Sequence, residues 1–379
     1  MVVRVHALSA RKLASLDGVR GLAILAVMMH HSAWGLNAAN VPERLFAFLM
    51  YQGWAGVDLF FVLSGFLITG ILLDSSCAVN YFKSFYARRA LRIFPLYFAF
   101  LLVALGLFPF VVPADWMPVP RDRWLYLCYL TNWQALWVGP WRHSVMAHLW
   151  SLAVEEQFYF CWPLLVWLVR PANLLWSLLI GEAAVIAGRW WWVAGHGASQ
   201  AVALATITRM DGLLLGAVCA IAVRRYRLPE RLVRRLPLLA SGGLMVYILL
   251  ALAASDKDRY AETIGFPLLA ICFALLVLYA VLTEGGTGPI QKFLCQRRLT
   301  QVGKYAYGLY VYHVPLFYFG DRLIAASVPA AVRSSFWFGC ASSAALCVIS
   351  YQVARLSYTH FERYFLNCKG RFELQYASR

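Results

Sequence analysis

The sequence contains little charge for its length, and acidic residues are especially scarce. Only 14% of the 379 residues are charged, whereas 61% are hydrophobic and the mean hydropathy is +0.63. A chain of this length would normally form two soluble domains. This composition leaves too little polar material to cover two soluble cores, so it excludes an ordinary soluble protein and favours one domain embedded in a membrane.

The nine cysteines lack the spacing that is typical of a disulfide framework or a zinc site. No CxxC pair occurs, and residues such as Cys219 and Cys272 lie inside apolar stretches. We interpret them as small buried hydrophobic residues, and we expect no metal site and no bound cofactor. A cleavable signal peptide is also not evident, so we expect the first apolar stretch to act as a signal anchor.

Long apolar stretches recur along the whole sequence, and each has about the length of a transmembrane helix. They predict an all-α fold, a polytopic transmembrane helix bundle with about ten spans. The stretches are 20–37, 54–73, 94–112, 148–169, 173–189, 200–223, 236–254, 264–283, 304–325 and 335–357. A further stretch, 124–139, is short for a span and carries Asn132 and Gln134.

The distribution of basic residues predicts which side of the membrane each segment between the apolar stretches faces. The net charge is +16, and Arg and Lys cluster in the short segments between apolar stretches. Such clusters mark the cytoplasmic side of a membrane protein, so nucleic acid is not an expected partner. If 124–139 crossed the membrane, the Arg-rich segment 224–235 would face outside and break this rule. We therefore predict ten spans with both termini cytoplasmic, and 124–139 at the outer interface.

Ionisable side chains are costly inside a bilayer, so those within the predicted spans are candidates for function. His31 follows Arg20 by eleven residues, about three helical turns, so both side chains share one helix face about 16 Å apart. The neighbouring His30 is rotated about 80° from that face. A lone membrane histidine can be a packing residue, but the aligned arginine favours a face with an anion-binding end and a proton-transfer end.

Other polar residues in the predicted spans allow both a structural and a functional interpretation. His148, Ser151 and Glu155 share a helix face. The adjacent carboxyl of Glu156 favours a polar cavity over simple packing at this depth. His313 suits a structural histidine that bonds to another helix as well as it suits a catalytic one.

Arg209 and Asp211 are two residues apart in the predicted sixth span, so on a helix they point to nearly opposite sides. Each therefore needs a partner of opposite charge on another helix. The candidate partners for Arg209 are Asp58, Glu155 and Glu156.

Residues 81–97 form a basic amphipathic segment that leads into the third predicted span. Arg88, Arg89 and Arg92 suit orientation in the membrane and contact with anionic lipids. They equally suit a phosphorylated cytosolic ligand, because a guanidinium group matches the geometry of phosphate.

Six segments of the sequence together resemble one protein family. In order they are LDGVRGLAILAVMMHHS, GVDLFFVLSGFLIT, FKSFYARRALRIFPLY, HLWSLAVEEQFYFCWP, TRMDGLLLGA and VGKYAYGLYVYHVP. Each is a weak signal alone, but the ordered set resembles the acyltransferase-3 family of bacterial membrane O-acyltransferases over residues 10–360. The family motifs fall on Arg20 with His31, on Arg89 with Arg92, and on Glu155.

The resemblance implies an enzyme of the bacterial cytoplasmic (inner) membrane. It would move an acyl group, usually acetyl, from cytosolic acyl-CoA to a hydroxyl of an extracytoplasmic glycan, a lipid-linked saccharide or another surface acceptor. Residues 1–360 would then form the membrane-embedded acyltransferase domain, in contact with membrane lipids, and residues 361–379 a short basic cytoplasmic tail.

We accordingly predict that His31 is the catalytic general base and that Glu155 orients its imidazole or holds its proton. An acyl-enzyme intermediate stays open. The alternative function is a proton-coupled transporter of a polar or acylated substrate, since intramembrane His, Glu and Arg suit that role too. The predicted substrate-binding residues are Arg20, Arg89, Arg92, Arg209, Asp211 and His313.

Overall fold

The computed structural model describes residues 13–137 and 144–376, and the regular elements in those ranges are all helical. The predicted all-α class is therefore confirmed. Residues 1–12 and 377–379, at the ends of the two predicted domain ranges, lie outside the described residues. So do residues 138–143, which include the end of the stretch 124–139.

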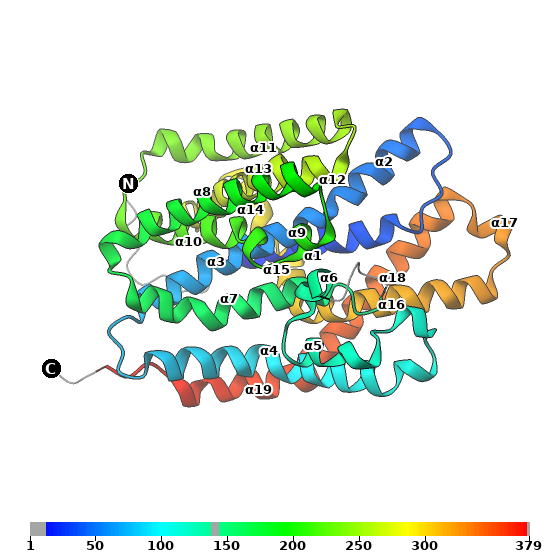
Figure 1. Cartoon of the computed structure of the whole chain (residues 1–379), viewed down its shortest axis with the longest axis horizontal. Helices are drawn as coiled ribbons and strands as arrows, with labels where there is room; N and C mark the ends of the chain where they lie inside the picture. The colour runs from blue at the N-terminus through cyan, green and yellow to red at the C-terminus, as the bar shows by residue number, and fades with distance from the viewer. Residues whose placement is uncertain (1–12, 138–143, 377–379) are drawn as a thin grey trace.

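Ten long helices form the body of the described part, and each overlaps one predicted apolar stretch. They are α1 (Ala14–Ala33), α3 (Gly56–Asp74), α4 (Tyr81–Gly106), α7 (Leu149–Leu168), α8 (Pro171–His196), α10 (Asp211–Arg225), α11 (Glu230–Ala253), α13 (Phe266–Leu282), α16 (Ala306–Ser327) and α18 (Phe336–Ser357). They run along the long axis of the molecule, and successive long helices are antiparallel (Figure 1).

Shorter helices connect or extend the long ones. The short α-helices are α2 (Val41–Tyr51), α5 (Arg123–Leu127), α6 (Gln134–Trp137), α9 (Gln200–Leu204), α12 (Lys257–Tyr260), α14 (Pro289–Leu294), α15 (Arg297–Lys304), α17 (Ala330–Arg333) and α19 (Arg363–Asn367). The 3₁₀ turns are η2 (Gln52–Ala55), η3 (Phe108–Phe110), η4 (Ala114–Trp116), η5 (Pro120–Asp122), η6 (Thr131–Trp133), η7 (Ile207–Arg209) and η10 (Cys368–Phe372). The π-helical turns are η8 (Ala261–Gly265) and η9 (Tyr358–Glu362).

Six helical segments of the described part are long and apolar enough to cross a membrane. They are Val41–Asp74, Tyr81–Phe110, Ala172–His196, Glu230–Ala253, Lys257–Leu282 and Phe336–Phe372. The remaining long helices, α1, α7, α10 and α16, carry many of the polar residues selected above, including His31, Glu155, Asp211 and His313. The count of ten spans stays a prediction.

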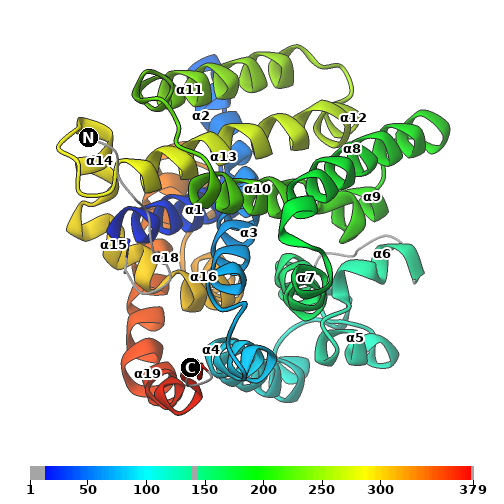
Figure 2. The same ribbon diagram turned by 90° about the vertical axis from the view of Figure 1, so that its left-hand side faces the viewer.

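Helices α3 and α10 share the most extensive helix contact of the described part and lie near the centre of the bundle in the view along its axis (Figure 2). A Cβ atom on Gly65 would lie 2.0 Å from the carbonyl oxygen of Leu213. A Cβ atom on Gly216 would lie 2.1 Å from the carbonyl oxygen of Val62. Glycine is needed at both positions because the two backbones touch, as is typical of packed membrane helices.

The predicted span 200–223 is divided, so the expectation of one continuous helix is wrong. Helix α9 ends at Leu204, and α10 begins only at Asp211. The hydroxyl of Thr208 donates to the carbonyls of Val202 at 2.5 Å and Ala205 at 2.9 Å. Irregular backbone at membrane depth requires partners from the protein itself, and these bonds supply some of them.

The described part of the stretch 124–139 forms only the short elements α5, η6 and α6, and it packs against α7 and the helix break. Asn132 is 1% exposed, and its amide donates to the hydroxyl of Thr206 at 2.9 Å. The side-chain amide of Gln157 in α7 donates to Asn132 at 2.8 Å. This agrees with the prediction that 124–139 does not cross as a helix, while its place at the outer interface stays a prediction.

The C-terminal segment packs against the beginning of α4. The hydroxyl of Ser84 donates to the carbonyl of Phe372 at 2.7 Å, and the amide of Asn80 donates to the carbonyl of Glu373 at 2.8 Å. Asp17 of α1 and Lys369 line one cavity, so both described ends of the chain lie at the same end of the bundle. The side of the membrane that this end faces, and the domain boundary at 360, stay predictions.

Candidate functional site

A cavity rich in arginine, which we call the basic cavity, lies between α1, α3, α4, α7 and α16. Its volume is about 110 Å³. Its polar lining consists of Arg20, Ser64, Arg89, Arg92, Ser151, Glu155, Tyr159, Tyr307 and Tyr310. Three predicted donor-binding arginines and the predicted catalytic glutamate therefore come together, although they lie far apart in the sequence.

Glu155 is held within the basic cavity by two hydroxyl groups. It accepts hydrogen bonds from Ser64 at 2.9 Å and from Tyr159 at 3.1 Å. The guanidinium of Arg89 lies over the ring of Tyr159, 5.7 Å from its centroid. The sequence contained no signal that Ser64 would meet a carboxyl 91 residues away.

A second cavity of about 320 Å³, which we call the basic entrance, adjoins the first. It is lined by Asp17, Arg20, Arg92, Gly303, Lys304, Tyr307, Tyr358, Glu362, Leu366 and Lys369. Arg20, Arg92, Gly303 and Tyr307 belong to both linings, so the two cavities share a wall. Gly303 allows α15 to pack directly against α1 at this wall, because a Cβ atom on residue 303 would lie 1.7 Å from the carbonyl oxygen of Asp17.

Two histidines on different helices meet near the far end of α1. The Nδ1 atom of His31 lies 2.9 Å from the carbonyl oxygen of Val27 and 3.3 Å from Nε2 of His313. The Nδ1 atom of His313 lies 3.0 Å from the carbonyl of Leu309 and 2.8 Å from that of Tyr310. Because carbonyls only accept, both Nδ1 atoms carry the hydrogen. Nε2 of neutral His31 is then free to accept a proton.

Tyr310 stands between this histidine pair and the basic cavity. It lines the cavity, its hydroxyl bonds to the hydroxyl of Ser151, and its ring centroid lies 5.7 Å from that of His313. The sequence predicts that Glu155 orients the imidazole of His31 or holds its proton. The side chain beside Nδ1 of His31 is that of His313, and Glu155 is held by Ser64 and Tyr159, so the predicted role of Glu155 stays a prediction.

A third cavity of about 450 Å³, which we call the aromatic cavity, was not foreseen from the sequence. His30 lines it, whereas Arg20, about 15 Å away along α1, lines the other two cavities. The full lining is His30, Phe48, Tyr51, Gln52, Trp54, Trp150, Ala203, Leu204, Arg209, Tyr247, Ala251, Lys257, Asp258, Tyr260, Ala261, Glu262 and Phe266. The aromatic cavity is thus displaced from the basic cavity along the helices.

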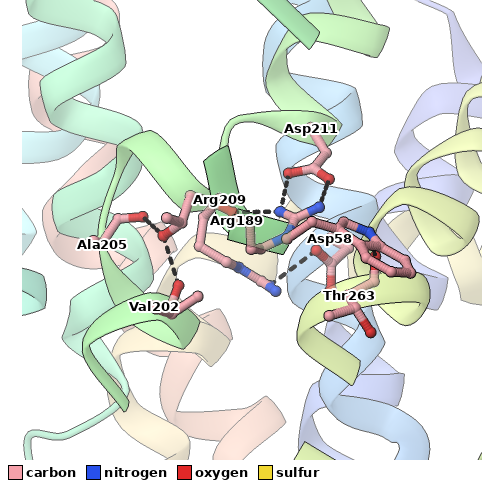
Figure 3. A network of polar contacts seen from close by, with 9 residues as sticks. Asp58, Arg189, Val202, Ala205, Arg209, Asp211 and Thr263 are labelled. Atoms are coloured by element: carbon pink, nitrogen blue, oxygen red, sulfur yellow. Dashed lines mark hydrogen bonds and ion pairs between the residues drawn. The ribbon is translucent and has the colours of Figure 1, made fainter. Parts of the chain in front are cut away.

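Two buried ion pairs lie next to the helix break (Figure 3). Arg209 donates to Asp58 at 2.9 Å, and Arg189 donates to both carboxylate oxygens of Asp211 at 2.7 and 2.6 Å. The prediction that Arg209 and Asp211 find separate partners on other helices is confirmed. Arg189 was not among the residues selected from the sequence. In the structure its side chain is fully buried, with 0% exposed.

The predicted substrate-binding residues consequently fall into different surroundings. Arg209 lines the aromatic cavity, whereas His313 contacts His31 and Asp211 is engaged by Arg189. Their roles in binding substrate stay predictions. Within the described ranges, no group of three or more His, Cys, Asp or Glu side chains is arranged to hold a metal ion.

Comparison with known proteins points to one family. The acyltransferase-3 family model, described as an acyltransferase domain, matches residues 13–352. The O-acetyltransferase OatA of Staphylococcus aureus strain NCTC 8325 is 28% identical over 334 residues, which cover 82% of this chain and 51% of that protein. OatA of strain COL gives the same values. The chain therefore spans about half the length of these curated relatives, and no solved structure matches it.

Proposed function

Because this chain belongs to the acyltransferase-3 family, we propose that it transfers an acetyl group from cytosolic acetyl-CoA to a hydroxyl of a glycan or lipid-linked saccharide across the membrane. The assignment as an acyltransferase rests on the family, and the names of the relatives support O-acetylation. The observation that carries the choice of donor and acceptor is a pair of differently lined cavities that both come near the two histidines. Tyr310 lines one cavity and lies next to His313, and His30 lines the other and lies next to His31.

The basic entrance and the basic cavity suit the donor. Coenzyme A carries phosphate groups, and arginine binds phosphate through paired, charge-assisted hydrogen bonds. Arg20 and Arg92 line both cavities, and Lys304 and Lys369 add positive charge to the entrance. In this proposal the nucleotide stays at the entrance, while the pantetheine and its thioester extend past Arg89 towards Tyr310.

The chemistry requires a base for the acceptor hydroxyl, and His31 suits this role. Nε2 of His31 would accept the hydroxyl proton as the oxygen attacks the thioester carbonyl. The new ester C–O bond forms, the C–S bond breaks, and the proton passes from His31 to the leaving CoA sulfur. The carbonyl of Val27 and Nε2 of His313 would together hold the hydrogen on Nδ1 of His31 and orient its ring, because both accept from that nitrogen.

Glu155 has a different part in this proposal from the one predicted from the sequence. Glu155 accepts hydrogen bonds from Ser64 at 2.9 Å and from Tyr159 at 3.1 Å, and these three side chains form one polar wall of the donor cavity. Arg89 stands beside the same tyrosine. We infer that Glu155 positions this wall around the acyl-pantetheine and does not act directly on His31.

The test uses purified full-length protein in proteoliposomes. Radiolabelled acetyl-CoA is supplied on one side and chitobiose, a neutral disaccharide, on the other. We expect O-acetylated disaccharide and free CoA thiol in equal amounts. Uptake of the disaccharide without acetylation would overturn the proposal and favour the proton-coupled transporter.

A further inference from the structure

We propose that the aromatic cavity is the acceptor site and that it selects an uncharged saccharide ring. This inference rests on the proposed function and names the class of its acceptor. A volume of about 450 Å³ is that of an ordinary small-molecule site. Its lining is aromatic and balanced in charge, whereas that of the basic cavity is rich in arginine.

Aromatic rings form much of the cavity wall and are held in place before a ligand arrives. The ring of Trp54 packs edge-on against Phe266 and Tyr247, with centroids 5.6 and 6.4 Å apart. The hydroxyl of Tyr247 donates to Gln52 at 2.7 Å, and that of Tyr260 donates to the carbonyl of Tyr247 at 2.9 Å. Such amphipathic rings offer an apolar face to the C–H groups of a sugar and polar edges to its hydroxyls.

The charged groups in the lining balance each other. Arg209 and Lys257 are positive, and Asp258 and Glu262 are negative. Lys257 donates to the carbonyl of Leu252 at 3.1 Å, so part of its bonding capacity is already used. A balanced lining gives a polyanion no net attraction, in contrast to the basic entrance. The charge therefore favours a neutral ring with many hydroxyls over a phosphorylated or acidic ligand.

Arg209 supplies buried donors that lack partners. The residue is 3% exposed, and one terminal nitrogen donates to Asp58 at 2.9 Å. The guanidinium lies over the ring of Phe266, 3.7 Å from the centroid. Its Nε and Nη1 atoms have no hydrogen-bond partner among the described residues. Buried donors are normally satisfied, so Arg209 has unused hydrogen-bonding capacity beside the cavity that it lines, and a ligand rich in hydroxyl oxygens suits this capacity.

His30 connects this cavity to the catalytic histidine pair. Its Nδ1 atom lies 2.7 Å from the carbonyl oxygen of Tyr51, so Nδ1 donates and Nε2 is left to accept from a hydroxyl. The ring centroids of His30 and His31 are 5.0 Å apart. A saccharide bound in the aromatic cavity would therefore have one hydroxyl beside His30 and close to the proposed base. We assign His30 a positioning role.

The test compares acceptors in acetyl transfer by the full-length protein in nanodiscs. The acceptors are chitobiose, a disaccharide that contains glucuronic acid, and ethanol. Tyr51→Ala removes a ring that is 49% exposed, and Trp54→Phe keeps a ring in the wall. Each variant should raise KM for chitobiose by about tenfold while kcat changes little, as expected when binding alone is weakened. The control Tyr376→Ala, whose ring is 57% exposed in the C-terminal segment, should behave as wild type.

Binding of radiolabelled chitobiose without acetyl-CoA, measured by equilibrium dialysis, separates the two proposals. Weaker binding by Tyr51→Ala than by Tyr376→Ala supports the site even if no acetyl transfer occurs, in which case the proposed function fails alone. Acetyl transfer with unchanged KM for chitobiose in both cavity variants overturns the site and leaves the proposed function standing. Preference for the acidic disaccharide overturns the selection of an uncharged ring.

Discussion

Nδ1 of His31 lies 3.3 Å from Nε2 of His313, although the two residues are 282 positions apart in the chain. His313 is itself fixed by two carbonyls of its own helix, so the pair has a defined direction of hydrogen bonding. In neutral His31 the hydrogen therefore lies on Nδ1, which leaves Nε2 as the nitrogen that can accept a proton. The roles of His31 and His313 can therefore be tested by separate substitutions.

Substitution of His31 should abolish most catalysis while the protein stays folded. His31→Gln keeps hydrogen bonding but cannot take up a proton, so we expect kcat to fall by about 10²–10⁴-fold. His30→Ala should retain far more turnover and instead raise KM for the acceptor. Initial rates at saturating acetyl-CoA check both, with size-exclusion profiles as the folding control. Near-normal turnover in His31→Gln would contradict the role of general base.

The role of His313 is tested by a pair of substitutions. His313→Gln can place an oxygen acceptor near the position of Nε2, whereas His313→Leu removes the acceptor. We expect kcat to fall at least about tenfold more in the leucine variant, because the ring of His31 then loses one of its two acceptors and is held by the carbonyl of Val27 alone. KM for acetyl-CoA should stay unchanged in both variants. Equal losses in the two would indicate that His313 only fills space.

Arg89 and Arg92 should contribute to donor binding. Loss of a charge-assisted hydrogen bond costs about 1.5–3 kcal/mol, so Arg89→Ala and Arg92→Ala should raise KM for acetyl-CoA about tenfold or more. Arg88→Ala is the matched control, since Arg88 is exposed on the same helix and is not among the lining residues of the three cavities. Acetyl-pantetheine, which lacks the nucleotide, should respond little to any of these changes. An equal response of all three variants would favour a role in membrane orientation.

The Arg189–Asp211 pair should stabilise the helix break without taking part in catalysis. Asp211→Ala leaves a buried guanidinium unpaired and should destabilise the protein by about 3–5 kcal/mol. Arg189→Met combined with Asp211→Leu should recover most of this loss. Thermal unfolding in detergent measures both effects. If folded Asp211→Ala loses affinity for the acceptor, the prediction of a substrate-binding Asp211 is supported instead.

The ten-span topology predicts which segments face outside. Reporters inserted after residues 120 and 195 should be extracytoplasmic, and those after residue 230 and at the C-terminus should be cytoplasmic. The basis is the positive-inside rule applied to the Arg-rich segment 224–235. An extracytoplasmic reporter at 230 would reverse the side from which the basic entrance receives the donor.

Some features of this protein were determined by the sequence alone, because they depend on local properties. Apolar stretches of helical length predicted all ten long helices, since hydropathy and helix formation are read within about twenty residues. The charge of Arg209 and of Asp211 required separate buried partners, and both were found. The family motifs likewise identified Arg20, Arg89, Arg92 and Glu155, which the fold brings to one cavity, whereas His31 is not among the lining residues of that cavity.

Only the tertiary structure decided which distant side chains meet. The contacts of His31 with His313 and of Ser64 with Glu155 join helices through packing that no local pattern encodes. The break after Leu204 depends on partners that include Asn132, from a segment the sequence left ambiguous. The aromatic cavity draws residues from widely separated segments of the chain, and a cavity of that kind exists only once those segments are packed together.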